Sequence, residues 1–147
     1  MSVSVVDSVE LASRLRPVLL LLNRHLRREA HAAGVTGGQA ALLAQIRHHP
    51  QLGVKELAAR EGISAPSMTR YLDRLERSGL IVRMRSAVDG RRIRIALTPK
   101  GVRVLRSVRR RRTAWLAERL NELSPSEQRA VSDAIEPLAQ LLEEGDR

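Results

Sequence analysis

The sequence contains no cysteine, only two aromatic residues and only two lysines. Without cysteine the chain can form no disulfide, no thiolate zinc site and no thiol-based redox sensor. The aromatic residues are Tyr71 and Trp115, whereas proteins that read RNA or single strands stack bases against several aromatic rings. These absences argue against a redox protein and against a reader of single strands.

Targeting and membrane-spanning segments are also lacking. The start, MSVSVVDSVE, has neither the basic region nor the long apolar region of a signal peptide. The apolar run PVLLLL at 17–22 is far shorter than the ~20 residues needed to cross a membrane. We therefore expect a cytoplasmic protein that makes no membrane contact.

Motifs of enzymatic or metal chemistry are missing as well. The sequence has four histidines, no serine or cysteine nucleophile in a recognisable motif, and a GVTGG segment without the lysine and spacing of a P-loop. His48 and His49 are adjacent, so on a helix they point to different sides and make a poor ligand pair. We expect no enzymatic activity, no cofactor and no metal, with a metal sensor as the weaker alternative.

What the chain does have is positive charge. Its 147 residues fit one domain, and its formal net charge of +10 favours contact with a polyanion. All but two of the 26 basic residues are arginine, which grips phosphates and guanine edges with paired hydrogen bonds. A genome rich in arginine codons would explain that ratio but not the net charge or its clustering. Together with the scarcity of aromatic rings, the charge points to double-stranded DNA.

Apolar periodicity and capping signals predict a mostly helical chain. We expect helices over about 8–31, from 36 to before Pro50, around 55–60, over 65–78, from 99 to about 123, and from 125 onward. Thr36 with Gln39 and Ser124 with Glu127 have capping-box spacing. Pro17 predicts a kink, or a restart of the first helix near Ser13.

The segment GVKELAAREGISAPSMTRYLDRLERSGLI, 53–81, has the pattern of a helix-turn-helix. Gly62 stands where a first short helix must end, Ser64 caps the second helix, and Gly79 closes it. Leu57 and Ala58 of the first helix and Met68, Leu72 and Leu75 of the second are the predicted core residues.

Two alternating runs then predict a β-hairpin around the turn Asp89-Gly90. We place Leu80, Val82 and Met84 on one face with Ile93, Ile95 and Leu97. The arginines at 83, 85, 92 and 94 are then placed on the polar face, with Arg91 at the tip.

At this point the sequence strongly resembles the MarR (multiple antibiotic resistance regulator) family of transcription factors. The resemblance lies in VKELAAREGISAPSMTRYLDRLERSGLI and in DGRRIRIALTPKG, whose family pattern falls on Asp89, Arg91, Leu97, Thr98 and Gly101. The order of elements agrees: a mostly α fold with a small β-wing, a winged helix-turn-helix held between N- and C-terminal helical dimerisation arms. We expect an arm at 1–35, the DNA-binding domain at 36–98, and the C-terminal helices of the dimerisation region at 99–147.

A helix-turn-helix inserts the start of its second helix into the major groove, and the hairpin becomes a wing lying along the duplex. Arg70 and Arg74 can reach guanine O6 and N7, although Arg74 could equally be an exposed helical charge. The alternative for the wing is a hairpin that arginines merely keep soluble. The predicted DNA contacts are Ser64, Pro66, Ser67, Thr69, Arg70, Arg74, Arg83, Arg85, Asp89, Gly90 and Arg91.

Arg91 is the predicted minor-groove contact, because narrow A·T-rich minor grooves concentrate negative potential and attract an inserted arginine. The family resemblance implies the same role. A carboxylate facing DNA would repel it, so Asp89 should either hold the Arg91 guanidinium or brace the turn.

The terminal helices have more apolar surface than one small winged helix can cover. Pairing two copies through them gives a homodimer with two reading helices about one DNA turn, ~34 Å, apart on a near-palindromic operator; the alternative is a compact monomer. The basic run RSVRRRRTAW, 106–115, is interpreted as a solvated face or as a partner for the region of Glu143 and Glu144 in a second subunit. A second DNA site is the weaker interpretation.

Two functions follow. The first is a transcriptional regulator, in particular a repressor that a small molecule releases from DNA; the resemblance implies a small aromatic or phenolic ligand but no ligand residues. The second is an architectural, nucleoid-type protein that binds duplex DNA broadly through charge. The defined reading helix favours the first, since nonspecific binding needs none.

Overall fold

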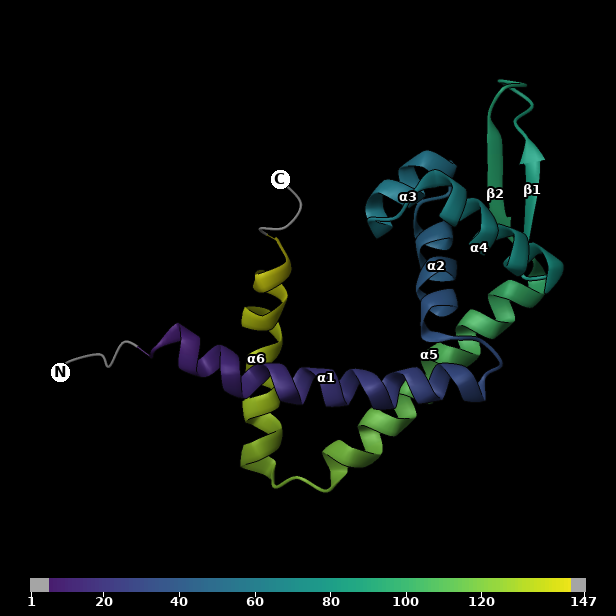
Figure 1. The fold of residues 1–147 in the computed structure, drawn as a ribbon. Helices are drawn as coiled ribbons and strands as arrows, with labels where there is room; N and C mark the ends of the chain where they lie inside the picture. Colours follow the sequence, from purple (N-terminus) through teal and green to yellow (C-terminus); the bar gives the residue numbers. More distant parts are fainter. Residues whose placement is uncertain (1–5, 144–147) are drawn as a thin grey trace. The chain divides into compact units, whose positions relative to one another are not determined.

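The computed structural model describes residues 6–143, and Figure 1 shows their helices and strands. The elements, in chain order, are α1 (Ser8–Ala32), α2 (Gly37–His48), α3 (Val54–Glu61), α4 (Ala65–Arg77), β1 (Ile81–Arg85), β2 (Ile93–Leu97), α5 (Pro99–Asn121) and α6 (Pro125–Glu143). The chain forms two compact units, one ending at Arg112 and one beginning at Thr113, and each is described by itself. In this part of the chain no helix combines the length and the apolar character needed to span a membrane.

The first helix is continuous, so the expected restart near Ser13 is wrong. Asp7 caps it by accepting a hydrogen bond from the Val9 N–H at 2.9 Å, and Pro17 lies inside it. Proline removes one hydrogen bond, to the carbonyl four residues earlier. The helix is 25 residues long, so its other hydrogen bonds on both sides of Pro17 keep it helical.

Helices α2, α3 and α4 form the helix-turn-helix core in the predicted way. Thr36 and Gln39 make both hydrogen bonds of the capping box, each at 3.0 Å. Gly62 ends α3 with φ 66°, a left-handed conformation that suits glycine. The five predicted core side chains are all buried, and α2 adds a further apolar face to them: Ala40, Leu42, Leu43 and Ile46.

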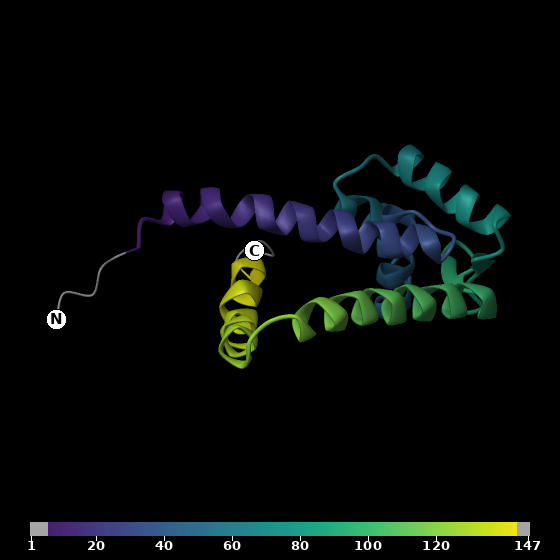
Figure 2. The same ribbon diagram turned by 90° about the horizontal axis from the view of Figure 1, so that it is seen from below.

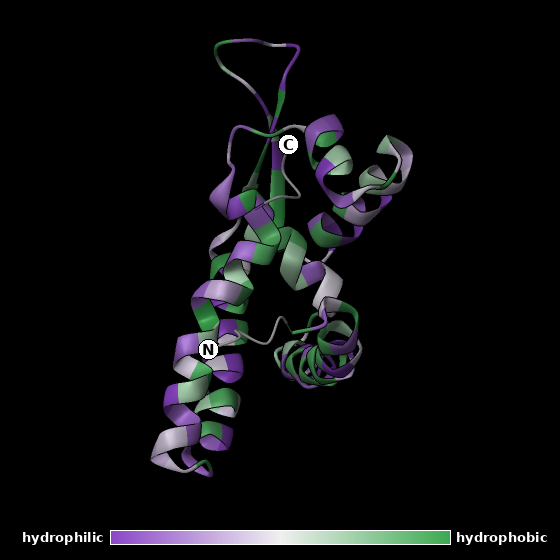
Figure 3. Ribbon diagram, turned by 90° about the vertical axis from the view of Figure 1, so that its left-hand side faces the viewer, coloured by the Kyte–Doolittle hydropathy of each residue, from purple (hydrophilic) through white to green (hydrophobic). Residues whose placement is uncertain are grey.

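The wing is antiparallel as predicted, but the faces assigned to it are wrong by one residue in β1. Strand register pairs Ile81 with Leu97 and Arg83 with Ile95, so Val82 and Met84 lie on the opposite face, where they are 39% and 54% exposed. The arginines are therefore split between the two faces instead of sharing one. Figure 3 shows both hydrophilic and hydrophobic stretches along the hairpin.

The shift has a local cause at the end of α4. Gly79 takes a φ of 73°, and the Leu80 N–H then donates to the Leu75 carbonyl at 3.0 Å. This helix-ending turn uses Leu80, so the strand begins one residue later, with Ile81 buried. Arg83 can occupy the inward face only because α4 offers it carboxylates.

The start of α5 locks the wing to the end of α4. The Thr98 N–H donates to the Leu80 carbonyl at 3.0 Å, and the Thr98 hydroxyl donates to the Gly79 carbonyl at 2.6 Å. Gly101 is buried against this junction, since an added Cβ would stand 2.1 Å from the Leu80 carbonyl oxygen. A glycine is required here by the close approach of two backbones.

Three arginines of the basic run on α5 make contacts inside the first unit. Arg109 donates to His48 Nε2 at 3.0 Å, Arg111 lies 3.9 Å from Glu29, and Arg112 donates to the Leu26 carbonyl at 3.0 Å. These contacts fasten α5 to α1 and α2. Glu144, half of the predicted intersubunit partner, lies outside the described residues.

The second unit consists of the end of α5 together with α6. Ser124 and Glu127 form the predicted cap, and the Arg119 guanidinium lies 5.6 Å from the centre of the Trp115 ring. The described part of α6 has no buried residue. Four of its large apolar side chains are exposed in the single chain: Val131, Ile135, Leu141 and Leu142.

Candidate nucleic-acid interface

Helix α4 carries the predicted reading residues on an exposed face. Ser64 caps the helix by accepting from the Ser67 N–H at 3.2 Å, and its hydroxyl also donates to Ser67 Oγ at 2.9 Å. Arg70 donates to the same Ser67 oxygen at 3.2 Å. These hydrogen bonds hold the Arg70 guanidinium along the first two turns of α4, beside exposed Pro66 and Thr69.

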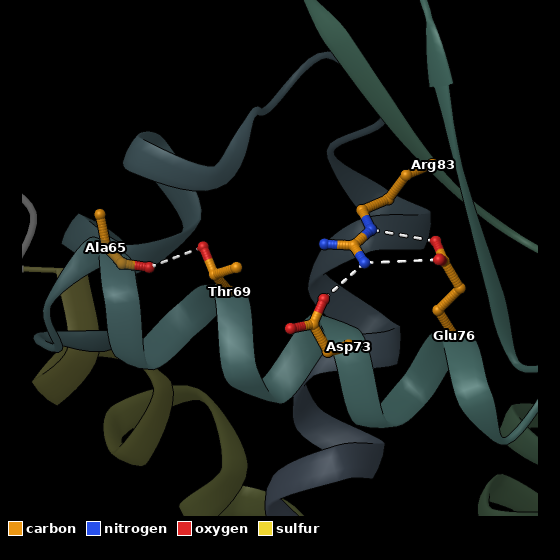
Figure 4. A network of polar contacts seen from close by, with 5 residues as sticks. All are labelled: Ala65, Thr69, Asp73, Glu76 and Arg83. Carbon is orange, nitrogen blue, oxygen red and sulfur yellow. Dashed lines mark hydrogen bonds and ion pairs between the residues drawn. The ribbon is translucent and has the colours of Figure 1, made fainter.

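Thr69 is turned toward its own backbone. Its hydroxyl donates to the Ala65 carbonyl at 3.0 Å (Figure 4), which leaves its oxygen lone pairs and methyl group for an external partner. Arg74 is exposed one turn beyond Arg70. Within residues 6–143 no carboxylate pairs with either guanidinium, so both are available to a ligand.

Tyr71 belongs to this face, although the sequence reasoning missed it. Its side chain is 47% exposed, and it lines one surface hollow with Ser67, Arg70 and Arg74. The signal was present in the sequence, because residues 67, 70, 71 and 74 fall on one side of a helix. A phenol at this position can donate a hydrogen bond to phosphate or to a base edge.

The tip of the wing is a turn built by Asp89. Its side-chain oxygen accepts from the Arg91 N–H at 3.1 Å, and its carbonyl accepts from the Arg92 N–H at 3.0 Å. Of the two roles expected for Asp89, the structure shows the brace of the turn. Gly90 and Arg91 are exposed, so the Arg91 side chain extends from a turn whose backbone is fixed.

Arg83 links the wing to α4 instead of extending into solvent. Its guanidinium donates to Glu76 at 2.9 Å and also to Asp73, and its side chain is only 23% exposed (Figure 4). Arg85 is exposed and stands opposite Ile93 in the strand register. The two arginines of β1 that were predicted as DNA contacts thus have different surroundings, and Arg83 sets the position of the hairpin relative to α4.

The hydrogen bond from Arg83, with its positive charge, lowers the pKa of the Glu76 carboxyl below the ordinary value of 4.5. A lowered pKa means that the carboxylate stabilises the fold above that ordinary value, and that this contribution disappears as pH falls through the folded pKa. We predict that Glu76→Gln lowers the melting temperature at pH 7 but no longer does so near pH 3. Melting curves of both proteins across this range test the prediction.

Glu118→Gln is the matched control for this series, because Glu118 is exposed and makes no ion pair among residues 6–143. Its melting temperature should follow that of the wild type at every pH. A difference in melting temperature between wild type and Glu76→Gln that stays constant down to pH 3 would contradict the role given to the ion pair between Arg83 and Glu76.

A second basic hollow lies between the start of α3 and the wing. It is lined by Lys55 and by Arg91, Arg92 and Arg94, and its one carboxylate, Glu56, accepts the Gly53 N–H at 3.1 Å. Cations on both sides of a gap suit a phosphate backbone, which is charged along its whole length. Hydroxyls and guanidinium groups on α4 suit base edges and phosphates. The combined surface can hold a duplex but offers no nucleophile with an adjacent base.

Comparison with known proteins places this arrangement in context. The family model described as "MarR family" matches residues 35–93. An uncharacterized HTH-type transcriptional regulator of Mycobacterium bovis is 31% identical over 138 residues, which cover 94% of this chain and 96% of that protein. The HTH-type transcriptional repressor MdtR of Bacillus subtilis is 34% identical over 110 residues, 75% of this chain and 71% of the repressor.

Among solved structures, a mutant of S. aureus MepR bound to an oligodeoxyribonucleotide has a similar fold. Its TM-score is 0.69 at 21% identity, and the match covers 89% of this chain and 96% of that chain. At this identity the likeness concerns the fold alone. It agrees with the mostly helical architecture and the two-stranded wing predicted from the sequence.

Proposed function

This chain belongs to the MarR family of transcriptional regulators, and we propose that it is a homodimeric repressor of a near-palindromic operator, released by a small molecule. The chain is a DNA-binding transcriptional regulator and not an enzyme. We propose that it acts in the cytoplasm, because its operators are located there. Repression, as opposed to activation, is supported by the similarity to MdtR, which is named a transcriptional repressor.

The observation that carries the proposal is the exposed face of α4 joined to a basic wing. Arg70 and Arg74 lack carboxylate partners among the described residues, whereas Arg83 is paired and fixes the angle between α4 and the wing. We therefore assign base and phosphate contacts to the solvent-facing residues at the start of the reading helix: Ser64, Pro66, Ser67, Thr69, Arg70 and Arg74. Arg91, Gly90 and Asp89 form the minor-groove tip, Arg85 contacts phosphate, and Arg83 positions the wing.

Dimer formation is supported by exposed apolar side chains on the terminal helices. Leu20 of α1 is 62% exposed, and Ile135 and Leu142 of α6 are 63% and 79% exposed. Patches of this kind on a chain that is otherwise highly charged mark interfaces. A twofold pair would also supply the two reading heads that a palindrome requires.

We predict that Ile135→Glu combined with Leu141→Glu converts the protein to a monomer, because each change buries a charge in the proposed interface. Light scattering at micromolar concentration should give twice 16.4 kDa for the wild type and 16.4 kDa for the variant. Gln140→Glu, on the same helix, should stay dimeric. A wild type of single-chain mass would contradict the proposal.

The ligand part of the proposal is supported by a hollow of about 350 Å³ between α2 and α4. Its floor includes Leu42, Ile63 and Met68, and Tyr71 and Arg74 stand at its edge. An apolar floor with a few polar groups and this volume fits a small aromatic acid or phenol. Melting shifts with salicylate-like acids, repeated with operator present, test whether such a ligand binds and whether it opposes DNA.

A competition titration tests the proposed function itself. A duplex carrying a palindrome from the protein's own promoter competes with a random duplex at ~150 mM salt, and the palindrome should win by about a thousandfold or more. Equal affinities for the two duplexes would favour the architectural, nucleoid-type alternative. No binding of either duplex would contradict both.

A further inference from the structure

A groove away from the reading face of α4 and from the wing tip runs between the end of α2, the outer face of the wing and the start of α5. Its main hollow, of about 340 Å³, is lined by Ile46 of α2 and Pro50 just beyond it, by Met84 and Ala96 of the wing, and by Val102 of α5. A smaller hollow of about 60 Å³ continues it along α5 and shares Arg47 and Val102 with it. All of these residues belong to the first compact unit.

The groove faces a different side of this unit from the reading helix. Seen along α2 in Figure 2, α4 lies on one side of that helix and the amino-terminal part of α5 on the other. The strand register turns Met84 away from Arg83 and from the α4 carboxylates that Arg83 binds. A molecule in the groove and a duplex on α4 therefore meet different side chains, although Pro50 and Arg94 line both the groove and the basic hollow between α3 and the wing.

The rim of the groove is strongly positive. Arg94 borders the larger hollow, Arg106 and Arg109 border the smaller one, and Arg47 borders both. No aspartate or glutamate of residues 6–143 lines either hollow. Only Arg109 is engaged, with His48, so the other guanidinium groups face the groove without a carboxylate partner in the described chain.

The floor of the groove is apolar, and part of it is exposed to solvent. Met84 is 54% exposed and its neighbour on the same face, Val82, is 39% exposed. A phosphate backbone presents charge along its whole length and would leave these side chains uncovered, so the floor argues against DNA as the occupant. Methionine side chains adapt to different apolar partners and recur on peptide-binding surfaces.

We propose that this groove binds an acidic amphipathic segment of a partner protein, whose apolar side chains contact Met84 and Val102 while its carboxylates pair with Arg47, Arg94 and Arg106. Charge complementarity favours an acidic partner, because a basic segment would be repelled by several arginines that have no carboxylate partner in the described chain. The apolar floor requires a partner with an apolar stripe, as in helix-in-groove recognition. Such contact would bring a second protein to the regulator without covering α4.

The test uses the full chain and a fluorescein-labelled synthetic helix of about 20 residues, with leucine at i, i+3, i+4 and i+7 and glutamate on the other face. Anisotropy titration should show saturable binding. Arg47→Glu with Arg106→Glu, and separately Met84→Glu, should each weaken it at least tenfold, and Met84→Ala should weaken it less. Arg103→Glu, on α5 outside the groove lining, is the matched control and should weaken it far less than the paired change.

Four results would overturn the proposal. Two concern the peptide: absence of saturable binding, or equal binding of a peptide with lysine in place of every glutamate. The third is a loss of random-duplex affinity in the Arg47→Glu, Arg106→Glu variant as large as the loss of peptide affinity, which would assign the groove to DNA. The fourth is a monomeric Met84→Glu variant in light scattering, which would assign the groove to a second copy of this chain. None of these readouts depends on operator recognition, so the proposed function can fail or stand separately.

Discussion

Replacing Arg91 with alanine should weaken operator binding more than tenfold at near-physiological salt while leaving the melting temperature unchanged. The side chain extends from a turn that the Asp89 side chain fixes by accepting from the Arg91 N–H, and this hydrogen bond uses only the backbone of Arg91. The substitution therefore removes the guanidinium without altering the turn. Its loss costs the contact with the negative potential of a narrow minor groove. Fluorescence anisotropy with labelled operator measures the dissociation constant.

Arg103→Ala is the control for charge alone, because it removes one exposed guanidinium that lies on α5 and not at the tip of the wing. At ~150 mM salt exposed charges more than about 8 Å apart are largely screened, so this variant should bind the operator nearly as well as the wild type. An Arg91→Ala protein with an unchanged dissociation constant would remove the wing tip from the mechanism.

Gly101→Ala should destabilise the fold by about 2 kcal/mol or more, the range expected for overpacking against backbone. The new Cβ would stand 2.1 Å from the Leu80 carbonyl oxygen, and neither α5 nor the end of α4 can move without breaking the Thr98 hydrogen bonds. Because these bonds also hold the wing, operator affinity should fall with stability. Urea unfolding measures the change in free energy.

Gly90→Ala is the matched control, since nothing lies within 4 Å of a Cβ added at the wing tip. It should leave the free energy of unfolding within about 0.5 kcal/mol of the wild-type value. If Gly101→Ala were equally mild, the backbone contact between α5 and Leu80 would not be the reason for glycine at this position.

The helix-turn-helix could be predicted from the sequence because local signals agree there. Ser64, Gly62 and Gly79 mark the helix ends, and Met68, Leu72 and Leu75 mark the buried face, so capping and periodicity specify the same boundaries. Gly101 stood out only through the family resemblance. Its physical reason, contact with the Leu80 carbonyl, joins residues that no short pattern connects.

The parts that could not be predicted depend on tertiary contacts. The face of β1 was misassigned because Leu80, an apolar residue in phase with Val82 and Met84, is used by the turn that ends α4. Arg83 was placed with the outward arginines because alternation of apolar and charged residues along a strand predicts that the charged side chains face solvent. The reason lies on α4, where Asp73 and Glu76 stand one turn apart and accept its guanidinium. Carboxylates at this spacing ahead of a strand arginine are the signal that could have revealed it.

Hydroxyl-radical footprinting of the operator complex tests the central claim most directly, because it reports where on the duplex the two reading heads lie. The account predicts two protected segments on one side of the duplex, centred about one helical turn, ~34 Å, apart and related by the operator's symmetry. A single protected segment, or two segments without a fixed spacing, would contradict it.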